Sequence, residues 1–324
     1  MPPPPTPEFW ARDGLLPSLL QPLAWVYATS AAARQAWTRP WQAPVPVVCV
    51  GNLVAGGAGK TPVVLSLAER LIARGVAVHC LSRGYGGASA GPMRVDPARH
   101  GAAEVGDEPL LLAATAPTWV ARDRVAGAKA AVGAGAKLLL LDDGLQNPTL
   151  AKDLSLLVID GGFGLGNGRV IPAGPLREPL AAGLAHTDAA VIIGDDAAGA
   201  ASLLAGKPLL RARIVPQSAA DLAGRATFAF AGIGRPAKFF ATLEGLGARL
   251  VARRGFADHH RYAETELAEM AAAAERAGAV LVTTAKDAVR LSPEWRARVR
   301  VLPIALEWED ASRLDALLER FLRG

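Results

Sequence analysis

The chain has 324 residues, 51% of them hydrophobic, and a formal net charge of +5. This length fits one large or two ordinary domains, and a charged fraction of 20% argues against a disordered chain. The sequence holds no Lys/Arg-rich run and no RNA-binding aromatic motif, so its charge favours small or membrane-bound anions over nucleic acid. The two cysteines, Cys49 and Cys80, lie in apolar runs and are predicted to be reduced core residues of a cytosolic protein.

The N-terminal segment, residues 1–40, is predicted to interact with a membrane surface. Tryptophan, which favours the membrane–water interface, is concentrated in and just after it. Pro17 and Pro22 interrupt its apolar run, so a spanning helix of about 20 residues is not expected. We expect instead an interfacial helix from Pro22 to Trp37. The alternative, a helix that packs on the following domain with its tryptophans in the core, stays open.

A glycine-rich turn between an apolar strand and a helix follows at residues 46–62, PVVCVGNLVAGGAGKTP. Glycines allow backbone N–H groups to point at phosphate oxygens, and the helix N-terminus adds partial positive charge. Lys60 would reach the β and γ phosphates, and Thr61 would bind Mg²⁺. The strict motif has glycine where this chain has Val54, and a related ATPase variant has lysine where it has Ala55. The predicted nucleotide-binding residues are Gly56, Gly57, Ala58, Gly59, Lys60 and Thr61.

Two polar segments come next. Residues 82–87, SRGYGG, follow an apolar run, and open α/β sheets bind ligands at the carboxyl ends of their strands. Asp107 and Glu108 stand at the entry of a helix whose first turn suits Pro109. These two carboxylates either cap that helix or serve a site, and the sequence alone leaves both readings open.

The aliphatic run 138–141 ends in Asp142 and Asp143. Four aliphatic residues ending in aspartate form the second half of a phosphate-loop site, in which the carboxylate faces Mg²⁺. Residues 161–178 then form a long glycine-rich loop with Arg169 and Arg177, and loops of this length are usually functional. We therefore expect residues 41–222 to form an α/β domain of the P-loop NTPase type, with a mostly parallel sheet flanked by helices.

A second αβ series begins near Thr227, so residues 226–324 are predicted to form a smaller α/β/α domain. Its last expected elements are a strand from Val299 to Ile304 and a helix from Ser312 to Leu322. The Asp258-His259-His260 triplet has no third ligand at zinc spacing. His259 is therefore either a polar surface residue or a residue that orients a catalytic carboxylate.

Taken together, these motifs resemble the tetraacyldisaccharide 4′-kinase family, the lipid A 4′-kinases of Gram-negative bacteria. The matching stretches span nearly the whole chain: GNLVAGGAGKTP (51–62), LSRGYGG (81–87), VGDEPLLLA (105–113), DDGLQNP (142–148), IPAGPLREP (171–179), FAGIGRPAKFF (230–240), FADHHRY (256–262) and TTAKDAVRL (283–291). The chain departs from the family pattern at Leu145, Asn147 and Ala58, none of which removes a charged group.

The resemblance implies transfer of the ATP γ-phosphoryl group to the 4′-hydroxyl of a tetraacylated glucosamine disaccharide 1-phosphate, forming lipid IVA. It implies ATP and Mg²⁺ as ligands, a P-loop kinase domain and a smaller domain that close over ATP. It also implies a peripheral position at the cytoplasmic face of the inner membrane, with the acylated lipid as substrate and no obligate protein partner.

The resemblance further implies residue roles. Asp107 would take the hydroxyl proton as general base, and His259 would pair with it once the domains close. The implied catalytic residues are Asp107, His259, Lys60, Arg124 and Arg177. The implied metal ligands are Thr61 and Asp142, and the implied substrate contacts are Tyr85, Glu108, Asp143 and Gln146.

Two other functions share parts of this pattern. A membrane-cycling P-loop ATPase switch would use Lys60 and the N-terminal segment, but Ala55 argues against it. A non-catalytic nucleotide-binding module would leave Asp107, Asp142 and His259 with structural roles only.

Overall fold

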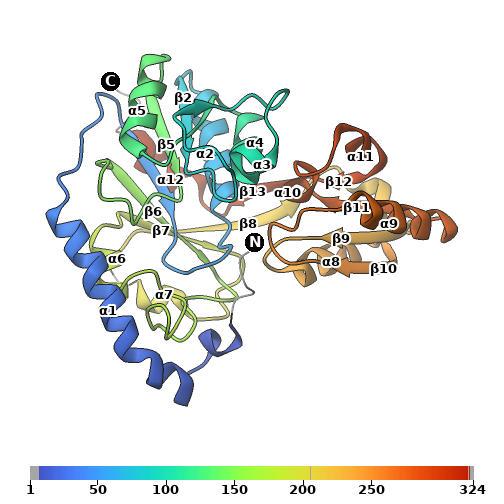
Figure 1. Cartoon of the computed structure of the whole chain (residues 1–324), viewed down its shortest axis with the longest axis horizontal. Coiled ribbons are helices and arrows are strands. Elements are labelled where there is room, and N and C mark those ends of the chain that lie inside the picture. The colour runs from blue at the N-terminus through green and yellow to red at the C-terminus, as the bar shows by residue number, and fades with distance from the viewer. Residues whose placement is uncertain (1–6, 205, 320, 322–324) are drawn as a thin grey trace.

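The protein, described here from a computed structural model for residues 7–204, 206–319 and 321, is built on two sheets (Figure 1). The larger has nine strands in the order β13-β8-β7-β6-β1-β5-β2-β4-β3. Its strands are β1 (Val47–Gly51), β2 (Val78–Ser82), β3 (Met93–Arg94), β4 (Thr118–Val120), β5 (Leu138–Asp142), β6 (Leu154–Asp160), β7 (Ala189–Ile193), β8 (Leu209–Pro216) and β13 (Ile304–Trp308). The smaller is the parallel sheet β10-β9-β11-β12, with β9 (Ala226–Ala231), β10 (Arg249–Gly255), β11 (Val280–Thr284) and β12 (Arg300–Leu302). The predicted fold class is confirmed.

Helices connect most of these strands. In the larger unit they are η1 (Glu8–Ala11), α1 (Leu15–Trp37), α2 (Lys60–Ile72), α3 (Ala102–Val105), α4 (Asp107–Ala113), α5 (Arg124–Gly133), α6 (Leu180–Ala185), α7 (Ala200–Leu203) and α12 (Ala311–Glu319). Beside the smaller sheet they are η2 (Ala220–Leu222), α8 (Pro236–Gly245), α9 (Glu264–Arg276), α10 (Ala285–Ala288) and α11 (Pro293–Arg298).

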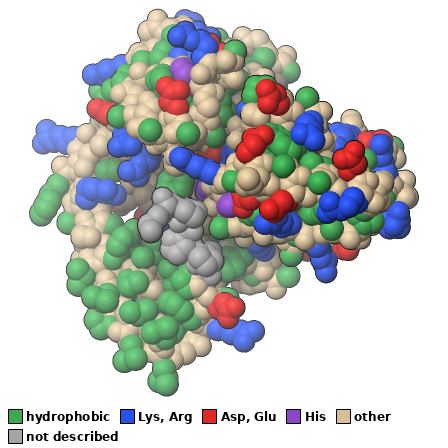
Figure 2. Space-filling model, turned by 45° about the vertical axis from the view of Figure 1, so that its right-hand side comes forward, with side chains coloured by type: hydrophobic (Ala, Val, Ile, Leu, Met, Phe, Trp, Pro, Cys, Tyr) green, Lys and Arg blue, Asp and Glu red, His purple; other side chains and the backbone are tan. Residues whose placement is uncertain are grey.

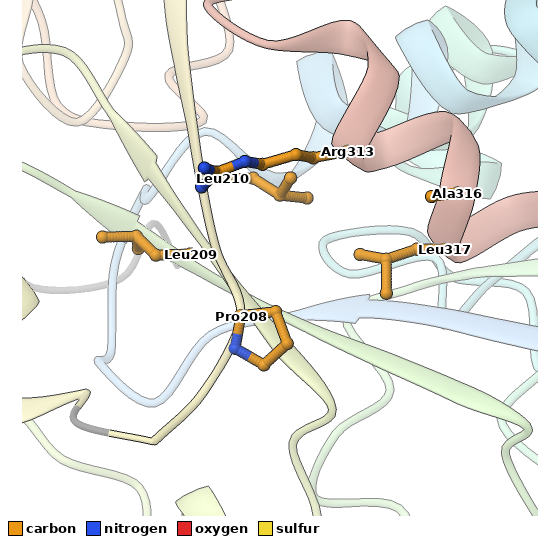
Figure 3. A pocket seen from close by; sticks show the side chains of 6 residues that line it. All are labelled: Pro208, Leu209, Leu210, Arg313, Ala316 and Leu317. Atoms are coloured by element: carbon orange, nitrogen blue, oxygen red, sulfur yellow. The ribbon is translucent and has the colours of Figure 1, made fainter.

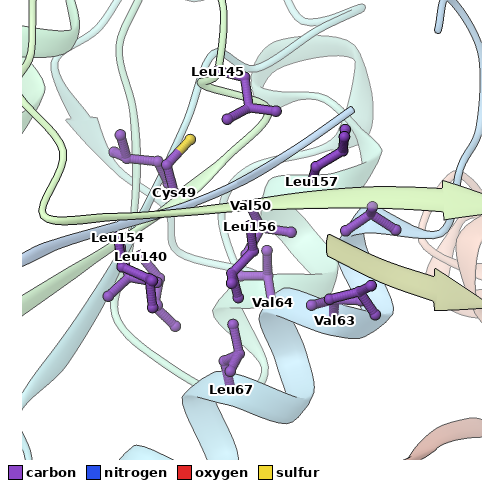
Figure 4. Packing of buried hydrophobic residues seen from close by; sticks show 14 of the residues in the cluster. Cys49, Val50, Val63, Val64, Leu67, Leu140, Leu145, Leu154, Leu156 and Leu157 are labelled. Carbon is purple, nitrogen blue, oxygen red and sulfur yellow. The ribbon is translucent and has the colours of Figure 1, made fainter. Parts of the chain in front are cut away.

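The central strand β1 lies between β5 and β6 and pairs with both in parallel. Its five residues are all buried, which explains why the strand reads as an unbroken apolar run rather than an alternating one. Val50 and Leu156 of the sheet belong to one buried cluster with Val64 and Leu67 of α2 (Figure 4). Full burial of one such side chain contributes about 1.5–3 kcal/mol. This packing holds the start of α2 against the end of β1, where the glycine-rich loop joins them.

The N-terminal helix is longer than expected. We predicted a helix from Pro22, whereas α1 begins at Leu15. Pro17 lies in its first turn, where a backbone N–H has no partner within the helix, and Pro22 is accommodated inside it. Most large apolar side chains of α1 are exposed, including Leu19, Trp25 and Trp37. The alternative in which the α1 tryptophans lie in the core is therefore wrong for Trp25 and Trp37.

The end of the chain also differs from expectation. The predicted strand 299–304 is two strands separated by Pro303, and they belong to different sheets. β12 completes the smaller sheet, whereas β13 pairs antiparallel with β8 at the edge of the larger one. Trp308 on β13 also donates a hydrogen bond from Nε1 to Ser66 on α2 (2.9 Å). The final helix ends at Glu319 in the described residues, and residue 322, where we expected its end, lies outside them. The division into residues 1–40, 41–222 and 226–324 stays a prediction, since sheet membership alone does not define a domain.

Candidate active site

The glycine-rich loop between β1 and α2 has the backbone that its glycines predict. Gly56 and Gly59 have φ values of 122° and 85°, which residues with a side chain rarely adopt. A Cβ on Gly59 would also lie 2.6 Å from Cδ1 of Ile193. Lys60 and Thr61 are the first two residues of α2, so both stand at the helix N-terminus as expected.

Three charged residues of the prediction meet beside this loop. Nζ of Lys60 lies 3.6 Å from Oδ2 of Asp143, and Nη1 of Arg177 donates to both carboxylate oxygens of Asp143 at 2.8 and 2.9 Å. Burial raises the pKa of Asp143, but the charges of Lys60 and Arg177 outweigh it, so the pKa lies below its ordinary value. Lys60 also donates to Oδ1 of the buried Asn52 (3.1 Å). Asn52 was not predicted as a site residue, although it directly follows β1, where open α/β sheets bind ligands.

The long loop 161–178 reaches this group by pairing with the glycine-rich loop. The N–H of Ala55 donates to the carbonyl of Pro175 (2.8 Å), and the N–H of Arg177 donates to that of Leu53 (2.7 Å). These two backbone bonds place Arg177 beside Asp143. Both loops fix Gln146, whose Nε2 donates to the carbonyl of Asn52 (3.1 Å) and to Oε1 of Glu178 (2.8 Å).

Asp142 ends β5 opposite Val50 of β1, at the edge from which the glycine-rich loop departs. Its Oδ1 is buried and has no hydrogen-bond partner among the described residues. Burial, reinforced by the nearby charge of Glu108, raises the pKa of Asp142 to about 7. A buried carboxylate oxygen without a partner suits a cation. No group of three or more His, Cys, Asp or Glu side chains is placed to hold a metal in the described residues.

Asp107 is the first residue of α4, and its carboxylate does not cap that helix. Instead Oδ2 lies 2.8 Å from Nδ1 of His259 and accepts a hydrogen bond from Nε of Arg290 (2.7 Å). Burial raises the pKa of Asp107, but the His259 hydrogen bond and the Arg290 charge outweigh it, so the pKa is lowered. The predicted pair Asp107 and His259 is therefore in direct contact across the two units. Arg290, which the sequence analysis did not single out, is the third member of this contact.

Glu108 takes part in the same junction. Its Oε1 lies 3.1 Å from Nζ of Lys286, which is also 3.4 Å from Oδ1 of Asp258 and from Nε2 of His259. Burial lowers the pKa of Lys286, but these carboxylates outweigh it and the pKa is raised. His260 contributes nothing here, because its Nε2 pairs with Glu266 (2.9 Å).

Tyr85 lies at this junction, whereas Arg124 lies closer to Asp142 and Asp143. The ring of Tyr85 is exposed and tilted against that of His259, with centroids 5.6 Å apart. Arg124 is buried, donates from Nη1 to the carbonyl of Ala121 (2.5 Å) and leaves Nε without a partner among the described residues. Burial and the charge of Arg83 lower the pKa of Arg124.

Figure 2 shows histidine, acidic and basic side chains together at the junction of the two units. An apolar pocket elsewhere, between β8 and α12, is lined by Pro208, Leu209, Leu210, Arg313, Ala316 and Leu317 (Figure 3). No residue of the predicted site lines it. The predicted residues gather instead at the glycine-rich loop and at the charged junction, which together form the candidate active site.

The chain is similar to a family of kinases over nearly its whole length. Residues 16–323 match the family described as tetraacyldisaccharide-1-P 4′-kinase. The tetraacyldisaccharide 4′-kinase of Rhodospirillum centenum is 59% identical over 98% of this chain and 97% of that relative. The enzyme of the same name from Rhodospirillum rubrum is 54% identical over 98% of each chain.

One solved structure is similar over nearly the whole length. It is described as the "apo" form of LpxK from Aquifex aeolicus in complex with ATP. The TM-score is 0.79 at 28% sequence identity, and the match covers 95% of this chain and 100% of the other.

Proposed function

The chain belongs to the tetraacyldisaccharide-1-P 4′-kinase family, and from this we propose how its own residues carry out the reaction. It is a kinase that uses ATP to phosphorylate the 4′ position of a tetraacyldisaccharide 1-phosphate in lipid A biosynthesis. The membrane-cycling ATPase is not favoured, because the relatives that match over the full length are named as 4′-kinases.

The phosphates of ATP bind at the glycine-rich loop in this proposal. Lys60 and the N-terminus of α2 provide positive charge there. Thr61 and Asp142 would hold Mg²⁺, and the unpartnered Oδ1 of Asp142 supports that role. When bound, Mg²⁺ neutralises charge on the β and γ phosphates. When the phosphates bind, Lys60 and Arg177 would leave their pairs with Asp143 and contact the phosphates instead. For Arg177 this exchange is favourable because guanidinium and phosphate form a strong bidentate pair.

The 4′-hydroxyl of the acceptor loses its proton to Asp107. Hydroxyl groups are poor nucleophiles, and a positioned base contributes about 10²–10⁴-fold. The lowered pKa keeps Asp107 ionised at neutral pH, and the contact from His259 holds its carboxylate in place. Tyr85 would line the acceptor site beside His259, with Glu108 held at the same junction by Lys286. Gln146 would contact the substrate from the side of the glycine-rich loop, and Arg124 would offset phosphate charge.

The contact of 2.8 Å between Asp107 and His259 carries this assignment, and substitution tests it. Asp107→Ala and His259→Ala should each slow phosphoryl transfer at least about tenfold while ATP binding changes little. His260→Ala is the matched control, since His260 pairs with Glu266 and should keep a near-normal rate. Near-normal rates in both dyad variants would exclude this pair as the catalytic residues.

We also propose that α1 docks on the membrane that carries the lipid substrate, at the cytoplasmic face of the inner membrane. None of the described helices has both the length and the apolar character to cross a bilayer. The exposed apolar side chains of α1, among them Leu19 and Val26, support a peripheral contact. Nε1 of Trp10 donates to the carbonyl of Pro172 (3.1 Å), and Arg169 pairs with Asp13, so the segment is tied to the loop that carries Arg177.

A further inference from the structure

Arg290 is held rigidly beside the proposed base. Its side chain is 3% exposed. Nε donates to Oδ2 of Asp107 (2.7 Å), while Nη1 donates to the carbonyl of Gly232 (2.8 Å) and to Oδ1 of Asp287 (2.9 Å). A planar guanidinium that makes three such contacts cannot rotate without breaking them.

Asp287 provides the fixed end of this arrangement. It is fully buried and accepts hydrogen bonds from the hydroxyl of Tyr262 (2.7 Å), Oγ1 of Thr284 (2.6 Å) and the N–H of Gly232 (2.9 Å). The carboxylate is thus fixed by donors from three segments of the smaller unit. Arg290 extends this network across the junction to Asp107 in the larger unit.

The contacts to Asp107 distinguish its two oxygens. Arg290 and His259 both approach Oδ2, whereas Oδ1 receives no hydrogen bond from the described part of the chain. Oδ1 is therefore the oxygen left to accept the proton of an incoming hydroxyl.

Lys286, four residues before Arg290, favours one tautomer of His259. Its Nζ lies 3.4 Å from Nε2 of His259, whereas Oδ2 of Asp258 is 3.7 Å from the same nitrogen, beyond hydrogen-bond distance. An ammonium group only donates, so its contact is a hydrogen bond where Nε2 accepts and Nδ1 carries the proton. Nδ1–H then donates to Oδ2 of Asp107, which agrees with the distance of 2.8 Å.

Stability alone does not account for Arg290. Nη2 of Arg290 is buried and has no partner among the described residues, and a buried donor that makes no hydrogen bond lowers stability. A buried ion pair is in general weak evidence for a stabilising role. A residue held at such a cost against the proposed base indicates a role in the reaction.

We propose that Arg290 is a positioning residue for phosphoryl transfer, fixing the Asp107 carboxylate so that Oδ1 faces the acceptor hydroxyl while Lys286 maintains the matching tautomer of His259. The inference rests on the proposed role of Asp107 as base. The segment 283–291, TTAKDAVRL, had no chemical role assigned from the sequence. In this proposal it orients the base when the two units meet.

The pH dependence of the reaction separates this role from a structural one. The charged and titratable groups around Asp107 are His259, Arg290, Lys286 and the adjacent Glu108. Removing the Arg290 charge takes away a contribution that lowers the pKa of Asp107. The acid limb of the kcat/KM profile should therefore move to higher pH.

The test uses the full chain with Mg-ATP and a detergent-dispersed tetraacyldisaccharide 1-phosphate. Arg290→Met should lower kcat at least about tenfold, leave the KM for ATP within about twofold and move the acid limb upward. Arg290→Lys should recover the acid limb, because the charge remains, but only part of kcat, because one ammonium cannot reproduce the fork. Arg296→Met is the matched control, since Arg296 donates to the carbonyls of Ala288 and Leu291 in the same segment without touching Asp107.

Two results with the arginine variants would overturn the inference. One is an Arg290→Met enzyme with unchanged rate and acid limb. The other is an equal shift of the acid limb in Arg296→Met, which would show that loosening the segment suffices. If Arg290→Met does not fold, Arg290→Lys is the deciding variant. The inference then requires that this variant keep the acid limb in place while losing part of kcat. Asp107→Asn runs alongside: a near-normal rate there removes the proposed base and this inference with it, whereas an inactive Asp107→Asn beside a normal Arg290→Met removes this inference alone.

Discussion

At the scale of single residues, Asp142 shows a conflict between stability and ligand binding. Its pKa is raised to about 7 by burial and by Glu108, whereas an unfolded aspartate has a pKa of about 3.9. From about pH 4 to pH 7 the unfolded chain has lost this proton while the folded chain keeps it, so stability falls as pH rises and stays lower above pH 7. Asp142→Asn should therefore raise the thermal midpoint of the metal-free, nucleotide-free protein clearly near pH 8 and little near pH 4.

The same substitution should abolish most of the phosphoryl transfer that depends on Mg-ATP, because an amide is a poor ligand for Mg²⁺. Calorimetry at the two pH values measures the first effect, and Asp195→Asn on the exposed surface is the control, with no change expected at either pH. A midpoint for Asp142→Asn that falls at both pH values would contradict the stability argument.

The sequence predicted the residues that local patterns identify. Lys60, Thr61 and Asp142 follow from a glycine-rich turn and a buried strand, and the structure places them where those patterns require. Arg290 could not be predicted in this way, because its partner Asp107 lies 183 residues earlier in the chain. No spacing rule links two such positions, and only the packing of the two units brings them together.

At the scale of elements, α1 shows where local signals mislead. Its prolines suggested an interruption, but one lies in the first turn and the other inside a helix that continues to Trp37. The split of residues 299–308 into β12 and β13 was equally hidden, because a strand pattern does not reveal which sheet the strand joins. The main strands around β1 were predictable because each is a buried apolar run bounded by turn residues.

The exposed side of α1 yields a prediction at this scale. The side chains of Leu19, Leu23 and Val26 are 76%, 58% and 66% exposed, so replacing all three with serine removes little packing. We expect the thermal midpoint to change by only a few degrees and binding to anionic lipid vesicles to fall about tenfold or more, since membrane affinity follows buried apolar area. Vesicle co-sedimentation measures this binding.

A serine at Leu203, which is 49% exposed on α7, is the control for this experiment and should leave vesicle binding unchanged. If the triple variant of α1 binds vesicles like the unmodified protein, the membrane contact lies elsewhere. If it unfolds instead, the exposed apolar side of α1 is part of the folded core rather than a docking surface.

At the scale of the whole molecule, the ion pairs that join the two units among the described residues all have their acidic partner on the larger unit. Asp107, Glu108 and Asp160 stand on the larger unit, and their partners on the smaller unit are basic. Asp160, at the end of β6, pairs with Arg235 and lies 4.0 Å from Lys238. This pair joins the units without taking part in the contact between Asp107 and His259.

Asp160→Asn should therefore weaken the junction without altering the base. The asparagine keeps an oxygen that accepts hydrogen bonds from the N–H groups of Gly162 and Phe163, so the local turn is preserved while the charge is lost. A partly exposed pair contributes about 0.2–1 kcal/mol, so we expect the KM for ATP to rise up to about fivefold and the acid limb of the pH profile to stay in place. Glu244→Gln, which loses a pair with Arg253 inside the smaller unit, should leave KM unchanged. A shifted acid limb in Asp160→Asn would mean that the charges at Asp160 and those around Asp107 are coupled. The pair at Asp160 would then be part of the catalytic arrangement rather than a separate contact between the units.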